Sequence, residues 1–86
     1  MNSELTYVWL FHGQGGRTVS GVFTTKDLAE NWISSNKLTG TLTRYPVDIS
    51  CYDYALQNGS FKPKHERQKT SVFMQSFSTG QTHYHY

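Results

Sequence analysis

The sequence predicts a small α+β domain: an antiparallel sheet with a ββαβ core, helices packed on one face of it, and a C-terminal strand or arm. Three observations lead to this fold class. Two β-prone runs flank a glycine-rich break, a capped amphipathic helix follows them, and a further extended run comes after that helix. Because the chain shows no internal repeat, low-complexity tract or linker, we expect residues 1–86 to form a single domain.

The first two predicted elements form a hairpin. Residues 7–11 (YVWLF) are a continuous apolar run, typical of a strand that is covered on both faces or central in a sheet. Residues 18–23 are again β-prone. The glycines between the two runs predict a turn with positive φ; the alternative is a nest of N–H groups for a phosphate, with Arg17 supplying charge. These glycines are Gly13, Gly15 and Gly16.

Capping signals predict a helix over residues 25–35. Thr24 and Asp27 have the spacing of a capping box, and Phe23 and Leu28 have the spacing of a hydrophobic staple. Asn36 is the expected left-handed terminator. Apolar residues at helical spacing form one face of this helix: Leu28, Ala29, Trp32 and Ile33.

An extended run follows from Leu38, and its alternation changes phase just before Pro46. Because a proline cannot donate to a sheet, we expect this strand to lie at an edge or to be bulged there. Ser50 and Asp53 repeat the capping-box spacing and predict a short helix that ends at Gly59. For residues 47–52, a strand that continues into this segment is the alternative.

The last third of the chain begins with a basic loop over residues 60–69, in which only Glu66 opposes the lysines and arginine. Thr70 or Ser71 then caps a last short helix, which residues 78–80 end. Residues 81–86 alternate polar and aromatic side chains, as in a terminal strand or an ordered arm.

Several motifs, in one order along nearly the whole chain, resemble a small bacterial domain family of unknown function. They are WLFHG (9–13), SGVF (20–23), AENWI (29–33), LTG (38–40), YPV (45–47), YDYA (52–55), FKPK (61–64) and HYHY (83–86). The resemblance implies a standalone bacterial cytoplasmic protein. It supplies no catalytic residue and no cofactor.

Composition narrows the classes of partner. No apolar run approaches the ~20 residues of a membrane span and no signal peptide opens the chain, so we expect a cytoplasmic protein with no membrane partner. The single cysteine, Cys51, fits a reducing compartment. A formal net charge of +2 is too small to indicate nucleic-acid binding by itself.

Two sets of polar residues are candidate sites. His83 and His85, two apart in an extended segment, point to the same side and would bind zinc or copper if His12, Cys51 or a carboxylate completed the set. Basic side chains and a tyrosine would instead hold a small anionic ligand such as a nucleotide, by pairing with phosphate and stacking on the base. That second set is Arg17, Arg44, Lys62, Lys64, Arg67 and Tyr84.

No residue pattern indicates catalysis, so we expect that the protein is not an enzyme and binds no cofactor. Cys51 as a nucleophile would need a neighbouring base and a lowered pKa, and a small buried residue at a helix start is the simpler interpretation. Because aliphatic residues are scarce, most aromatic rings are expected in the core, and those left at the C-terminal end suit a protein interface. The sequence therefore favours a non-enzymatic regulatory module that binds a protein or its own copy. A binder of a small anion and a metal-binding protein are the alternatives.

Overall fold

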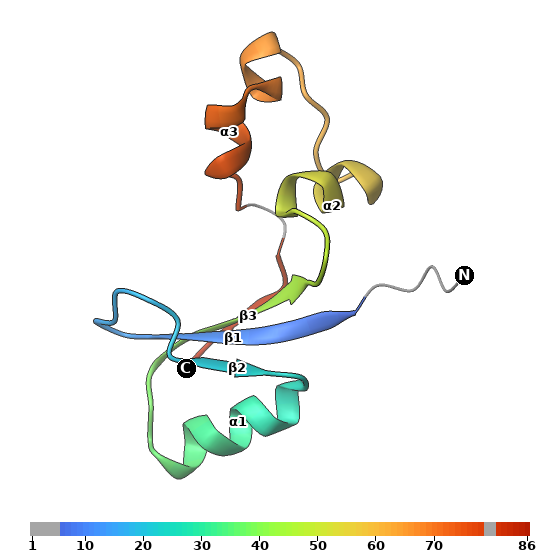
Figure 1. Ribbon diagram of the computed structural model, residues 1–86. Coiled ribbons are helices and arrows are strands. Elements are labelled where there is room, and N and C mark those ends of the chain that lie inside the picture. The colour runs from blue at the N-terminus through green and yellow to red at the C-terminus, as the bar shows by residue number, and fades with distance from the viewer. Residues whose placement is uncertain (1–5, 79–80) are drawn as a thin grey trace.

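The computed structural model describes residues 6–78 and 81–86, and over these residues it confirms the α+β class. A four-stranded antiparallel sheet has the order β2-β1-β3-β4 and is accompanied by helices (Figure 1). The elements are β1 (Tyr7–Gly13), β2 (Gly21–Phe23), α1 (Lys26–Ser35), β3 (Gly40–Pro46), α2 (Cys51–Gln57), the 3-10 helix η1 (Glu66–Lys69), α3 (Ser71–Gln75) and β4 (His83–His85).

The predicted hairpin is confirmed, with a second strand shorter than the sequence pattern. β1 pairs with β2 through the register Trp9↔Phe23, and β2 begins only at Gly21. In the connecting loop the Gly16 N–H donates to the Gly13 carbonyl at 3.0 Å, and Gly15 has φ 82°. The positive φ is at the third position of this four-residue turn, where glycine is favoured.

The helix predicted over residues 25–35 is confirmed, but its cap is displaced by one residue. Thr25 is the N-cap, and its side-chain oxygen accepts the Leu28 N–H at 3.2 Å. The predicted capping box at Thr24 and the staple at Leu28 are therefore wrong, and Leu28 is 53% exposed. At the other end, Lys37 and not Asn36 takes the left-handed conformation, with φ 55°.

β3 lies between β1 and β4 and pairs with β1 without interruption up to Pro46, so the prediction of an edge or a bulged strand is wrong. Its partner β4 covers only residues 41–43, whereas Pro46 is the last residue of β3 and lies opposite Tyr7 of β1. The proline thus stands where a neighbour is present on one side only, which avoids the cost of its missing N–H. The chain then enters α2, whose N-cap Ser50 accepts the Asp53 N–H at 2.9 Å, so residues 47–52 do not continue the strand.

The main core lies between α1 and one face of the sheet. Phe11 of β1 and Leu42 of β3 are buried against Ala29 and Ile33 of α1. The Trp32 ring meets the Phe11 ring edge-on, with centroids 5.8 Å apart. Because side chains alternate along a strand, β1 directs its odd-numbered residues to this core and its even-numbered residues to the opposite face.

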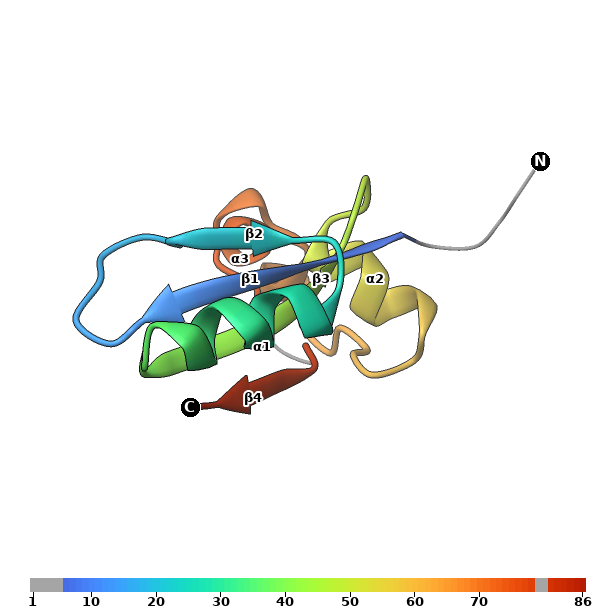
Figure 2. The same ribbon diagram turned by 90° about the horizontal axis from the view of Figure 1, so that it is seen from below.

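A second, separate cluster of aromatic rings joins α2, η1 and α3. The buried Tyr52 lies at its centre: its ring is 5.5 Å from Phe77 and 5.6 Å from Phe61, and its hydroxyl donates to the Gln68 carbonyl at 2.7 Å. These elements stand away from the sheet on the side opposite α1 (Figures 1 and 2). Thr70, one of the two predicted caps, caps α3. The helix ends at Gln75 and so before the predicted end at residues 78–80, of which 79 and 80 lie outside the described residues. None of the helices in the described ranges is long and apolar enough to cross a bilayer.

Candidate functional site

The sheet face opposite α1, hereafter the open face, has no helix packed across it among the described residues. α1 covers the other face, and α2 contacts the sheet at the end of β3 and through Tyr54 at Tyr7 of β1. By strand alternation and register, the open face carries no lysine, arginine, aspartate or glutamate. Val22 at its edge is 64% exposed. Its residues are Val8, Leu10, His12, Val22, Thr41, Thr43, Tyr45, His83 and His85.

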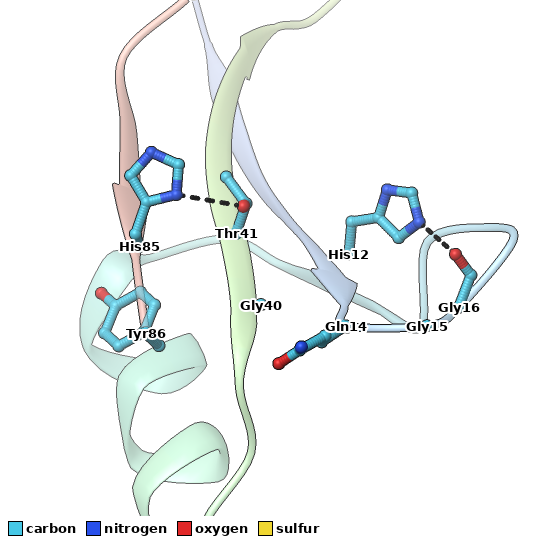
Figure 3. Close-up of a pocket in the computed structure, with 9 residues that line it drawn as sticks. His12, Gln14, Gly15, Gly16, Gly40, Thr41, His85 and Tyr86 are labelled. Carbon is cyan, nitrogen blue, oxygen red and sulfur yellow. Dashed lines mark hydrogen bonds between the residues drawn. The ribbon is translucent and has the colours of Figure 1, made fainter.

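One end of the open face is hollowed to a volume of about 480 Å³ (Figure 3). The β1–β2 loop forms one wall, and β3 and β4 form the other. His12 and His85 stand on the two sides of Thr41, and the remaining lining residues are Gly13, Gln14, Gly15, Gly16, Gly40 and Tyr86. This hollow is wide, shallow and lined by uncharged groups, apart from two imidazoles that bear a charge only when protonated.

Hydrogen bonds orient the polar side chains of this hollow. The Gly16 carbonyl is 2.6 Å from His12 Nε2 and can only accept, so that nitrogen carries a proton. The Thr39 hydroxyl donates to Gln14 Oε1 at 2.9 Å across the loop base. Gly40 permits the close approach of β3 to β1 here, because an added Cβ would overlap the His12 carbonyl oxygen and lie 2.8 Å from Gly13 Cα.

The three histidines that the sequence grouped are only partly brought together. His83 and His85 are neighbours on β4, with ring centroids 5.0 Å apart. His12 lies two strands away, because Thr41 pairs with His12 on one side and with His85 on the other. Among residues 6–78 and 81–86, no group of three or more His, Cys, Asp or Glu side chains could hold a metal ion.

The basic residues proposed for an anionic ligand lie in different parts of the fold. Arg17 is in the β1–β2 loop at one end of the sheet, whereas Lys62, Lys64 and Arg67 are exposed on the unit formed by α2, η1 and α3 (Figure 1). The Arg44 guanidinium lies 4.1 Å from the centroid of the Tyr7 ring, a cation–π contact within the fold. None of these cations lines either of two hollows on the described surface, which lie beside the β1–β2 loop and beside α1.

Tyr84 and Tyr86 fasten β4 to α1. The Lys26 ammonium lies 3.8 Å from the centroid of the Tyr84 ring, and the Trp9 ring packs 6.1 Å from it. The Tyr86 hydroxyl donates to Glu30. Partial burial and the Glu30 carboxylate raise the pKa of Tyr86 to about 12. These rings hold β4 in place as a terminal strand, which is one of the two forms predicted for residues 81–86.

Cys51 begins α2 as a half-buried residue, and burial raises the pKa of its thiol. A raised pKa keeps the sulfur protonated, which is the reverse of what a nucleophilic cysteine requires. Tyr7 and Tyr54 share a hydrogen bond of 3.2 Å between their hydroxyls, and this bond is the largest of the causes that raise the pKa of Tyr7. The raised pKa values of Cys51 and Tyr7 thus follow from burial and from a hydrogen bond within the fold, and neither indicates a reactive group.

Sequence reasoning missed Gln14, Thr41 and Gly40 as residues of the hollow. Thr41 lies between His12 and His85 only because β3 pairs with β1 on one side and with β4 on the other. The alternation of β1 did place His12 on the face opposite Trp9 and Phe11, which is the signal from which this face could have been found.

Comparison with known families gave one result that covers most of the chain. Residues 8–86 match the family described as domain of unknown function (DUF7710). Curated proteins and solved structures gave no significant match. The open face, its hollow and the histidines of β4 are therefore features of a chain that belongs to the DUF7710 family.

Proposed function

We propose that this protein is a non-enzymatic, regulatory binding module whose open face docks onto an apolar surface of a protein partner. The observation that carries the proposal is the contrast between the two faces of one sheet. α1 packs on one face of the sheet. The open face has no covering helix over its apolar side chains, which are Val8, Leu10, Val22 and Tyr45.

The chemistry of the open face selects the class of partner. Interface cores in protein complexes are depleted of charged residues and enriched in aromatic ones, and the open face combines apolar and hydroxyl-bearing side chains with Tyr45. Phosphate-bearing partners would need lysines or arginines at the contact, and this face has none. An uncharged protein surface complements it best.

Val22→Glu tests this proposal, because it places a charge at the most exposed apolar position of the open face. The matched control is Val72→Glu on α3, where the valine is 72% exposed and lies on the distant aromatic unit. We expect a partner captured by crosslinking in cells, and then purified, to bind the wild type and Val72→Glu equally. Val22→Glu should weaken this binding at least about ten-fold, a loss of about 1.4 kcal/mol.

Hydrogen exchange of the purified complex gives the location of the contact. Protection of β1 and β3 on binding supports the proposal. Protection confined to residues 60–69, or binding that Val72→Glu abolishes and Val22→Glu preserves, contradicts it and transfers the function to the basic segment.

A further inference from the structure

We propose that His83 and His85 form half of a zinc site, which a second copy of the chain completes by pairing its β4 with this β4. This inference goes beyond the partner proposed for the open face. It requires the outer edge of β4, with which no other strand of the described residues pairs (Figure 2).

The backbone already holds the two imidazoles at the separation that one ion requires. Tyr84 points toward α1, so its neighbours His83 and His85 both point to the open face. Their ring centroids are 5.0 Å apart. Two imidazole nitrogens bound to one zinc ion at about 2.1 Å, at a tetrahedral angle, place the ring centroids about 5 Å apart.

The hydrogen bonds of both rings leave the same nitrogen available. His83 Nδ1 lies 3.1 Å from the Gln81 carbonyl, which can only accept, so the proton is on Nδ1 and the Nε2 lone pair is free. His85 Nδ1 lies 3.4 Å from the Thr41 hydroxyl oxygen. An outer partner on the second ring nitrogen is the usual support of a zinc-bound histidine.

Within one chain the site is incomplete. Zinc prefers four ligands, and no third His, Cys, Asp or Glu joins this pair in the described part of the structure. His12 is on the same face, but two strand spacings, about 10 Å, separate its backbone from that of His85. The described residues do not supply the missing ligands, and a second copy offers the same two imidazoles.

The outer edge of β4 has the hydrogen-bonding groups to recruit them. Gly40 and Tyr86 exchange both backbone hydrogen bonds, at 3.2 and 2.8 Å, and the Arg44 N–H donates to the Thr82 carbonyl. The even-numbered residues of this segment therefore bond inward to β3, and the N–H and C=O groups of His83 and His85 point outward. Such an unpaired edge is a template for another strand.

A two-fold antiparallel pairing of two β4 strands, centred on Tyr84, supplies the missing zinc ligands and also pairs the outer backbone groups of β4. It places His83 opposite His85 of the second copy, in the class of antiparallel pair that exchanges two backbone hydrogen bonds. All four imidazoles then lie on one face, with directly opposite Cβ atoms about 5 Å apart. Four imidazole nitrogens from two copies close the tetrahedral set.

Zinc titration of the untagged, chelator-treated protein tests the inference, with calorimetry for stoichiometry and sedimentation velocity for mass. We expect one zinc ion per two chains and a monomer that becomes a dimer with zinc. Cobalt in place of zinc should give the intense visible bands of a tetrahedral site. His83→Ala and His85→Ala should each abolish the dimer, and the controls His12→Ala and His65→Ala should retain it.

Three outcomes would overturn the inference: one zinc ion per monomer, a dimer that forms equally without metal, or loss of zinc binding in His12→Ala. Both β4 variants replace exposed side chains, so circular dichroism should show an unchanged fold. Val22→Glu should leave zinc-dependent dimerisation intact, which separates failure of this inference from failure of the proposed binding role.

Discussion

At the scale of single residues, Tyr86 connects the last strand to the first helix through the charge of Glu30. Its hydroxyl donates to that carboxylate, and partial burial together with Glu30 raises its pKa from 10.0 to about 12. A raised pKa means that folding favours the neutral phenol. The stabilisation is therefore complete below pH 10 and is lost as the pH rises from 10 to 12.

The Tyr86→Phe variant should lose this pH-dependent part of the stability. At pH 8 we expect it to be less stable than the wild type by about 1 kcal/mol, the effect of one exposed hydrogen bond to a charged group. The difference should shrink as the pH approaches 12. Urea unfolding followed by tryptophan fluorescence at several pH values measures it. A difference that stays constant from pH 8 to 12 would mean that the hydroxyl contributes only through packing.

At the scale of elements, the start of α1 depends on which of two adjacent threonines is the cap. Thr25 makes the cap hydrogen bond to the Leu28 N–H, and the Thr24 side chain makes no hydrogen bond among the described residues. Thr25→Ala should destabilise the domain by about 1 kcal/mol, and Thr24→Ala by less than about 0.5 kcal/mol. Thermal unfolding of the two variants, which differ by one position, is the measurement. Equal losses of stability in the two variants would show that either threonine can cap α1, which would contradict this prediction.

The same threonines show what the sequence can predict of an element. Apolar spacing located the helix itself, because a face of Ala29, Trp32 and Ile33 can be buried in only one helical phase. The cap spacing indicated Thr24, one residue too early, because the cap also depends on where the chain leaves β2 at Phe23 and turns. That turn is set by the pairing of β2 with β1, which local sequence does not record.

The candidate site was less predictable than the elements. Alternation over residues 81–86 placed His83 and His85 on the same side, since this depends only on an extended backbone. The distance of His12 from this pair depends on β3 lying between β1 and β4, whereas the sequence had indicated an edge or a bulge for that strand because of Pro46. His12 was added to the pair as a possible ligand by residue type alone, and the strand order separates it from them.

At the scale of the whole molecule, the aromatic residues are divided between two clusters that share few contacts. Phe11, Phe23 and Trp32 pack with α1 on the sheet, whereas Tyr52, Phe61, Phe73 and Phe77 hold α2, η1 and α3 together. The hydroxyl contact between Tyr7 and Tyr54 is one of the bridges between them. The sequence predicted that most aromatic rings would lie in the core. It could not predict which rings belong to which cluster, because both clusters consist of the same kinds of aromatic residue.

This division predicts that the two clusters unfold separately. Tyr52→Ala removes the buried ring at the centre of the second cluster, and we expect the unit of α2, η1 and α3 to lose about 3 kcal/mol of local stability. Hydrogen exchange should then show fast exchange in that unit and retained protection in β1 and β3, since their core is Phe11, Leu42, Ala29 and Ile33.

Tyr52→Phe, which removes only the hydrogen bond to Gln68, should have a smaller effect of about 1 kcal/mol. Phe11→Ala should instead remove protection from the sheet. If Tyr52→Ala accelerates exchange equally in both units, the domain has one cooperative core, and the open face is then stabilised from both sides of the molecule.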